Sequence, residues 1–300
     1  MTDLLALLHI NLWQGVIILI AALLIGIGKT GISAAVLLAI PLLATEFGAK
    51  ESTGIMLVIF ILGDLLAVKA YREFVNRKEI LQLLPSSIAG IIIGAFLGNI
   101  IDARTFKIVI ASIILVCVGA MLFLGRKSKD GKEVSVPHSI WFVIFIGVLC
   151  GFTTMIGNAA GPIFAIYLLA MGFEKKYYLG TTAWFFFAIN LIKLPIQIFA
   201  WHNISLGTLG IALLALPVLY LGSVIGIRIV KVMNEKTFRY VIVIMTVAAA
   251  IMTSFLANAY DFKGDLTMQK LIDGLVKFRK GDFEAHRDLF RGKERAAHAD

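Results

Sequence analysis

Three charged side chains lie well inside apolar stretches of this 300-residue chain, namely Lys29, Asp64 and Lys193. A lysine at the centre of a membrane helix costs about 2.5–3.5 kcal/mol on an insertion scale, so such residues mark functional sites. Asn190 precedes Lys193 by three residues, which places both side chains on one helical face. Two lysines favour an anionic ligand. The carboxyl group of Asp64 is then either a partner for one lysine or a carrier of protons.

Asp64 and Lys193 each have a structural interpretation that the sequence leaves open. Asp64 precedes Lys69 and Arg72 near the end of its apolar stretch, which suits an interfacial role. Lys193 stands seven residues before Ala200, so its long side chain could extend to the membrane surface. Lys29 has no such alternative and is the strongest candidate of the three.

Two glycine-rich interruptions, Gly26–Gly31 and Gly151–Pro162, lie beside the two shortest apolar stretches. Each is expected to unwind the backbone, so that the next helix directs free N–H groups and a positive dipole end at the break. Two such ends near the membrane midplane would bind an anion. The predicted substrate-binding residues are Gly28, Lys29, Thr30, Gly31, Gly157, Asn158, Gly161, Asn190 and Lys193, with Asp64 as the candidate for proton coupling. The alternative is that glycines only permit close helix packing, as expected for Gly90, Gly94, Gly222 and Gly226.

The composition decides the class of protein that holds these residues. The chain is 59% hydrophobic and 16% charged, whereas soluble domains are about 25% charged. Apolar stretches cover roughly 10–27, 31–45, 53–70, 81–100, 105–125, 139–156, 158–172, 177–200, 207–227 and 237–256. A membrane span needs about 20 residues. The second and seventh stretches are shorter, so we expect half-helices or re-entrant segments there, and eight to ten membrane segments in all.

The two halves of the apolar region repeat each other, at a spacing of 126 residues and, further along, of 132. The matching positions include Gly31 and Gly157, Lys50 and Lys176, Gly54 and Gly180, Asp64 and Asn190, Pro85 and Pro217, Gly90 and Gly222, and Gly94 and Gly226. Such a repeat predicts two structurally equivalent halves.

Equivalent loops of the two halves have opposite charge bias. Residues 71–78 carry three basic side chains, whereas 201–205 carry no Lys or Arg; residues 102–104 are nearly neutral, whereas 228–236 are basic. Because basic loops stay in the cytoplasm, the halves are expected to be inverted in the membrane. The predicted fold is an all-α polytopic membrane protein of two inverted repeats, each with four to five membrane helices. The predicted divisions are 1–125 (first repeat), 126–138 (cytoplasmic linker), 139–256 (second repeat) and 257–300 (polar amphipathic tail).

The sequence lacks the residue patterns that a nucleic-acid, metal or catalytic site would need. The net charge of +9 comes from short clusters between apolar runs, so a nucleic-acid partner is not expected. Cys117 and Cys150 lie in apolar stretches and are expected to be core residues. The histidines have no metal-ligand spacing, so no metal, cofactor or catalytic residue is predicted and the protein is not expected to be an enzyme. The aromatic run Trp184–Phe187 is expected to face lipid or the core.

The two breaks and their surroundings resemble the sulfite exporter TauE/SafE family (domain of unknown function 81). The resemblance rests on Gly26-Ile-Gly-Lys-Thr-Gly31, Gly63-Asp64-Leu65, Pro85 with Gly90 and Gly94, Gly151-Phe-Thr-Thr154 with Asn158 and Gly161-Pro162, and Asn190-Leu-Ile-Lys193-Leu-Pro195, and it covers about residues 10–256. It implies a multi-pass plasma-membrane transporter of small anions such as sulfite, organosulfonates or related carboxylates. Lys-Thr replaces the triple glycine that is commoner at the first break of this family and adds a positive charge.

Together these features predict a secondary transporter, expected to be an exporter, that moves a small anion by alternating access. Its partners would be the anion and the lipid bilayer, with protons as candidate coupling ions and a homo-oligomer left open. Two other functions stay open: an anion channel, and a membrane scaffold whose partner docks on the tail 257–300. A membrane-embedded enzyme is disfavoured because no nucleophile stands beside a base.

Overall fold

The computed structural model describes residues 10–98, 100, 139–245 and 247–248. In these ranges every regular element is helical, as the composition predicts. The helices are α2 (Leu12–Thr30), α3 (Ala34–Phe47), α4 (Ala49–Tyr71), α5 (Arg77–Leu97), α7 (Ile140–Gly157), α8 (Gly161–Ala170), α9 (Lys175–Phe199) and α10 (Leu206–Val232). Residues 235–245 are helical as well. Within the described part, six helices are long and apolar enough to cross a membrane, namely α2, α4, α5, α7, α9 and α10.

Some sequence predictions concern other residues. The stretch 105–125 with Cys117, the linker 126–138, residues 246 and 249–256 of the last stretch and the tail 257–300 lie outside the described residues.

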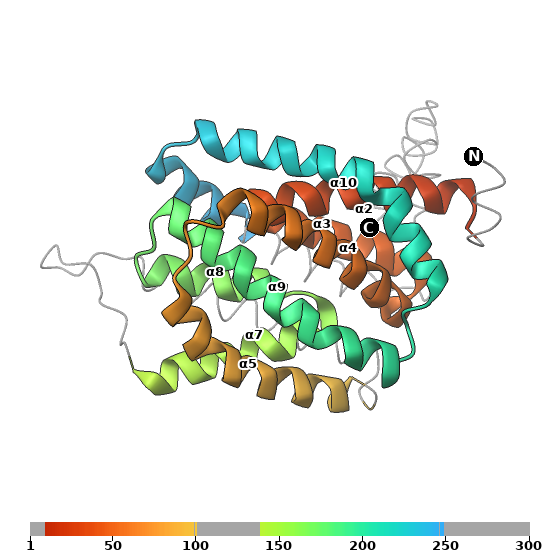
Figure 1. The fold of residues 1–300 in the computed structure, drawn as a ribbon, viewed down its shortest axis with the longest axis horizontal. Coiled ribbons are helices and arrows are strands. Elements are labelled where there is room, and N and C mark those ends of the chain that lie inside the picture. The colour runs from red at the N-terminus through yellow and green to blue at the C-terminus, as the bar shows by residue number, and fades with distance from the viewer. Residues whose placement is uncertain (1–9, 99, 101–138, 246, 249–300) are drawn as a thin grey trace, which may run out of the picture. The chain divides into compact units, whose positions relative to one another are not determined.

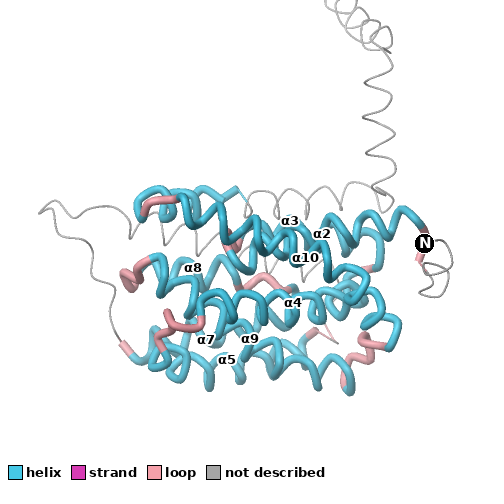
Figure 2. The backbone as a smooth tube through the Cα atoms, turned by 45° about the horizontal axis from the view of Figure 1, so that its top comes forward, coloured by secondary structure: helices cyan, strands magenta, loops and turns pink. Residues whose placement is uncertain are grey.

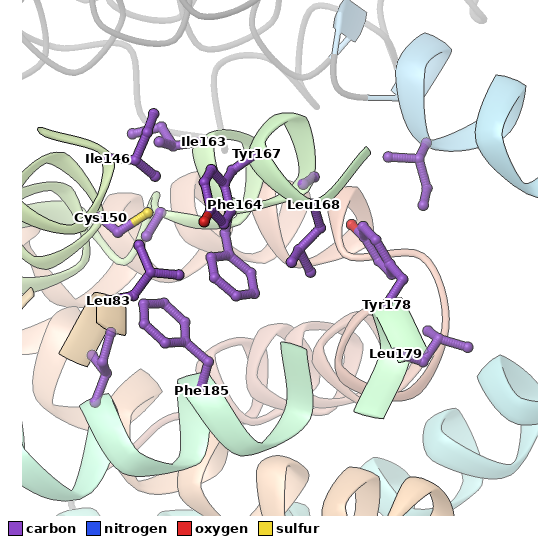
Figure 3. Packing of buried hydrophobic residues seen from close by; sticks show 14 of the residues in the cluster. Leu83, Ile146, Cys150, Ile163, Phe164, Tyr167, Leu168, Tyr178, Leu179 and Phe185 are labelled. Carbon is purple, nitrogen blue, oxygen red and sulfur yellow. The ribbon is translucent and has the colours of Figure 1, made fainter. Parts of the chain in front are cut away.

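The two short helices, α3 and α8, are the short segments that the apolar stretches predict. Helix α8 has 10 residues, which at 1.5 Å per residue is about 15 Å, half of a hydrocarbon core of about 30 Å. Its residues from Pro162 to Leu168 are all buried. Phe164 on α8 stacks on Phe185 of α9 with ring centroids 4.1 Å apart, and both belong to the core that surrounds α8 in Figure 3. Cys150 lies in this core, as predicted.

Each glycine-rich run unwinds only near its end, over fewer residues than the sequence predicts. Helix α2 continues through Gly26 and Gly28 to Thr30, and α7 continues through Gly151 to Gly157. The non-helical connection from α2 to α3 comprises only residues 31–33, and the one from α7 to α8 comprises only residues 158–160. A continuous helix satisfies its own N–H and C=O groups in a setting without water, so each unwound turn is kept as short as the change of direction allows.

The glycines inside these helices instead permit close packing between α2 and α10 and between α5 and α7, which lie side by side in Figure 1. A Cβ atom on Gly222 would lie 2.3 Å from the carbonyl oxygen of Leu23, and one on Gly90 would lie 2.1 Å from that of Val148. Gly90 and Gly222 are repeat positions, and Leu23 and Val148 lie 125 residues apart. The packing role predicted for these glycines is confirmed, and the α2–α10 and α5–α7 contacts match each other.

Helices α4 and α9 lie between these two pairs of helices and pack against each other (Figure 2). A Cβ atom on Gly54, near the start of α4, would lie 2.1 Å from the carbonyl oxygen of Asn203, which follows α9. One on Gly180, near the start of α9, would lie 1.8 Å from that of Phe74, which follows α4. The start of each helix thus meets the end of the other, so α4 and α9 run antiparallel.

Candidate functional site

A cavity of about 30 Å³ lies where both non-helical connections meet the central helices α4 and α9. This is room for about two water molecules, at 10–15 Å³ each. The wall is formed by residues of α2, α3, α4, α7, α8 and α9 together with parts of the two connections. The lining residues are Gly28, Lys29, Ser33, Val36, Leu37, Phe60, Asp64, Thr154, Asn158, Gly161, Thr182, Ala183, Phe186 and Asn190.

The structure brings together most of the residues that the sequence singles out. Those in the cavity wall are Gly28, Lys29, Asp64, Asn158, Gly161 and Asn190. Lys193 contacts two wall residues from behind. Thr30, Gly31 and Gly157 do not line the cavity.

An ion pair crosses the cavity from α2 to α4. The ammonium of Lys29 lies 2.8 Å from Oδ1 of Asp64, and the two side chains are only 8% and 1% exposed. Nδ2 of Asn190 donates to Oδ2 of the same carboxylate at 2.6 Å. Asp64 and Asn190 are repeat positions, so the antiparallel helices α4 and α9 meet at this hydrogen bond. Because Asp64 is fully buried, the interfacial alternative for this residue is wrong.

Two aromatic rings enclose the ammonium of Lys29. The ring centroid of Phe60 lies 4.4 Å from Nζ and that of Phe186 lies 5.1 Å from it. Such contacts attract a cation by about 0.5–2 kcal/mol each. The expectation that the run 184–187 faces only lipid or the core is therefore wrong for Phe186, which lines the cavity. The sequence repeat could have identified these two rings, because Phe60 and Phe186 are 126 residues apart.

Lys193 is fully buried, so it does not extend to the membrane surface. Its ammonium donates to the carbonyl oxygen of Thr154 at 2.7 Å, to Oγ1 of Thr154 at 3.3 Å and to Oδ1 of Asn158 at 2.6 Å. These three acceptors match the three hydrogens of an ammonium group. The lysine therefore fixes the end of α7 and the connection that follows it.

The connection from α7 to α8 is shaped by Asn158, which has left-handed backbone angles (φ 55°, ψ 25°). Asparagine tolerates this conformation better than most residues, and it ends α7 in a sharp turn. Helix α8 then begins at Gly161 with no side-chain cap, so the first N–H groups of the helix are left without helical acceptors. A Cβ atom on Gly161 would meet nothing within 4 Å, because this glycine borders the cavity.

The chain at the end of α2 is held by packing, although Ser33 further along the connection lines the cavity. The hydroxyl of Thr30 lies 2.8 Å from the carbonyl oxygen of Ser223 on α10, and its carbonyl accepts a hydrogen bond from Tyr71 at 2.6 Å. A Cβ atom on Gly31 would lie 2.9 Å from the carbonyl oxygen of Gly226. The structure thus places Thr30 and Gly31 against α10, away from the cavity.

The buried charges near the cavity do not cancel. In their ordinary ionised forms, Lys29 and Lys193 contribute two positive charges and Asp64 one negative charge, which leaves a formal net charge of +1. Ser33, Thr154 and Thr182 also line the wall. Thr154 belongs to the second glycine-rich interruption, whereas Ser33 and Thr182 could not be singled out from the sequence, because isolated Ser and Thr residues occur throughout apolar helices. A buried site with excess positive charge and several hydrogen-bond donors can accommodate a small anion.

A sequence model of one protein family, described as sulfite exporter TauE/SafE, matches residues 16–253. The match runs from α2 past α10 and includes every residue that lines the cavity. Among curated proteins and solved structures, none matches the chain. The family resemblance predicted from the two breaks is confirmed: the chain is a multi-pass membrane protein that belongs to the sulfite exporter TauE/SafE family of membrane transporters.

Proposed function

We propose that this protein is a secondary transporter that exports a small anion, such as sulfite, across the plasma membrane by alternating access. One observation carries the proposal: the cavity between the two halves holds a buried ammonium whose only carboxylate partner among the described residues is Asp64. A buried ion pair of this kind contributes little to stability compared with apolar packing. Its retention is explained if Lys29 exchanges Asp64 for another anion.

Binding takes the form of a competition for Lys29. In the arrangement described here the cavity is only about 30 Å³, so a polyatomic anion enters when the Lys29 side chain leaves Asp64 and turns toward it. The anion then lies against the amide of Asn158 and the start of α8 at Gly161, where the helix dipole adds attraction.

Coupling to protons follows from the same competition. The anion meets Lys29 while Asp64 is ionised, and once the anion has taken Lys29 from it, the carboxylate of Asp64 has lost its cation and takes up a proton. Asn190 stays beside the carboxyl group in both states. Proton and anion are thus bound together and cross the membrane together, so net export requires an outward anion gradient that is steeper than any opposing proton gradient.

Alternating access uses the relation between the halves, which we propose to be an inverted repeat. The antiparallel helices α4 and α9 support it, as do the matched contacts of α2 with α10 and of α7 with α5. In an inverted repeat, the movement that opens the cavity to one side has an equivalent that opens it to the other. Asp64 and Asn190, which meet at the centre, stay near the axis of this movement.

The test is anion flux into proteoliposomes that contain the purified full-length protein. An outwardly or inwardly directed proton gradient should drive sulfite against its own gradient in the wild type. Lys29→Met should abolish this flux, because it removes the cation while keeping an unbranched side chain that is shorter by only one heavy atom. Lys69→Met is the matched control, since Lys69 lies on α4 outside the cavity and is exposed.

Two results would count against the proposal. Wild-type flux in a folded Lys29→Met protein would show that the cavity is not the anion site. Flux that only ever runs down the anion gradient would show a channel.

A further inference from the structure

The cavity wall holds two asparagine side chains whose amide orientations are set by charged neighbours. Oδ1 of Asn158 accepts from the ammonium of Lys193 at 2.6 Å. An ammonium only donates, so the other end of this amide is Nδ2, a donor. Nδ2 of Asn190 donates to the carboxylate of Asp64 at 2.6 Å. An ionised carboxylate only accepts, so the other end of this second amide is Oδ1, an acceptor.

Both remaining amide atoms are buried and unpaired. Asn158 is 5% exposed and Asn190 is 1% exposed. Among the described residues, neither Nδ2 of Asn158 nor Oδ1 of Asn190 has a hydrogen-bond partner. An unsatisfied buried polar atom costs about 1–3 kcal/mol, and such atoms are rare in folded proteins. Because both residues line the same cavity, a ligand in the cavity can pair with both.

The role of Lys193 follows from its own hydrogen bonds. All three of its hydrogens have acceptors on Thr154 and Asn158, so none is left for a ligand. Lys193 is also absent from the cavity wall. It is therefore a positioning residue that turns the donor end of Asn158 to the cavity, while Lys29 is the cation that the ligand meets.

The two amides together specify the chemistry of the ligand. A donor from Asn158 and the ammonium of Lys29 require acceptor oxygens on the ligand. The acceptor oxygen of Asn190 requires a hydrogen on the ligand. While Asp64 is ionised, as it is when the ligand enters, the net charge of +1 is balanced by one negative charge. We infer, on the basis of the proposed function, that the transported ligand is a singly charged oxyanion that retains a hydroxyl group.

Hydrogen sulfite and hydrogencarbonate are ions of this kind, whereas nitrate and the ionised sulfonate group have no hydroxyl hydrogen to donate. A site built to pair with a ligand hydroxyl discriminates strongly against analogues that lack it, because its own acceptor is then left unpaired. The site should therefore accept only some of the small anions that a transporter of this family could carry.

The test compares hydrogencarbonate with nitrate, two planar ions with four heavy atoms and one negative charge. Binding is measured by calorimetry on the full-length protein in lipid nanodiscs. The wild type should bind hydrogencarbonate about tenfold more tightly or better. Because hydrogencarbonate is also the stronger acceptor, the decisive quantity is the change in this ratio in Asn190→Leu. The ratio should fall several-fold in this variant.

Asn158→Leu is the matched control for Asn190→Leu. It should lower the affinity for both ions by a similar factor and leave the ratio of the two affinities near the wild-type value. Lys193→Met should have the same effect, because Asn158 then loses the hydrogen bond that orients it. Asn190→Ser serves as a second variant if Asn190→Leu does not elute as a single folded species.

Equal binding of the two ions by the wild type, or an unchanged ratio in the Asn190 variants, would overturn the inference while leaving anion transport intact. Absence of binding by any anion, sulfite included, would overturn the proposed function as well.

Discussion

Replacing Asp64 by asparagine removes the carboxylate that competes with the anion and should therefore have opposite effects on stability and on affinity. In the ligand-free protein, Lys29 loses a partner at 2.8 Å while its side chain is only 8% exposed. Breaking a buried ion pair costs about 3–5 kcal/mol. The rings of Phe60 and Phe186, at 4.4 and 5.1 Å, remain beside the ammonium, and the new amide oxygen can still accept from it. The cost should therefore lie at the lower end, about 3 kcal/mol.

This loss is large enough to measure. With the scaling of soluble domains of 150–250 residues, about 2–4 °C for each kcal/mol, Tm should fall by about 6–12 °C. The anion should then stabilise Asp64→Asn more than the wild type, because it fills the vacated place beside Lys29 without competition. We expect the Kd for sulfite to fall about tenfold or more, which corresponds to about 1.4 kcal/mol.

The assay is thermal unfolding of the purified protein in nanodiscs at increasing sulfite concentrations, with Glu79→Gln as control. Glu79 is also a buried carboxyl group, hydrogen-bonded by the hydroxyl of Tyr167, but it lies outside the cavity wall. Its substitution should lower Tm without changing the Kd. A folded Asp64→Asn protein that binds sulfite no more tightly than the wild type would refute the competition between Asp64 and the anion.

Three further predictions concern the packing of α5 on α7 and two residues of the cavity wall. Gly90→Ala should lower stability by about 1–3 kcal/mol or more, because its Cβ would lie 2.1 Å from the carbonyl oxygen of Val148; an unchanged Tm would show that α5 and α7 are not packed this closely. Gly161→Ala should leave Tm unchanged, since nothing lies within 4 Å of the new atom, yet weaken anion binding because the methyl group takes cavity space; equal sulfite titrations for variant and wild type would contradict this. Phe186→Leu should slow transport severalfold through the loss of a ring contact worth about 0.5–2 kcal/mol, and flux at the wild-type rate would argue against a role for this ring.

The sequence predicts those parts of the site that depend on the cost of burying a charge and on the length of an apolar stretch. A charged side chain in an apolar stretch has to be paired or functional wherever it lies, so Lys29, Asp64 and Lys193 could be identified without a structure. The short helices α3 and α8 could be identified because an apolar stretch of about 15 residues is too short to span a membrane of about 30 Å.

The parts that depend on the neighbouring helix could not be predicted. A glycine unwinds a helix or packs it against another according to what faces it, and Gly26 faces the backbone of α10. The hydroxyl of Thr30 bonds to a carbonyl oxygen 193 residues away, so no local pattern shows that it turns from the cavity. Lys193 was predicted to contact the anion, whereas its hydrogens are all used within the protein. Only the three-dimensional arrangement distinguishes a residue that contacts the anion from a residue that positions its neighbour.

The small size of α8 has a consequence for how the protein is made. An isolated apolar helix of 10 residues is too short to leave the translocon as a spanning segment, which takes about 20 residues. The turn at 158–160 exposes backbone groups that lipid cannot satisfy. Residues 140–170 can therefore take their final form only after α9 has been synthesised and has covered α8 with Phe185. Membrane insertion of this region is then a late, cooperative step of biogenesis, and ribosomal release before Phe199 should leave a chain that quality-control proteases recognise.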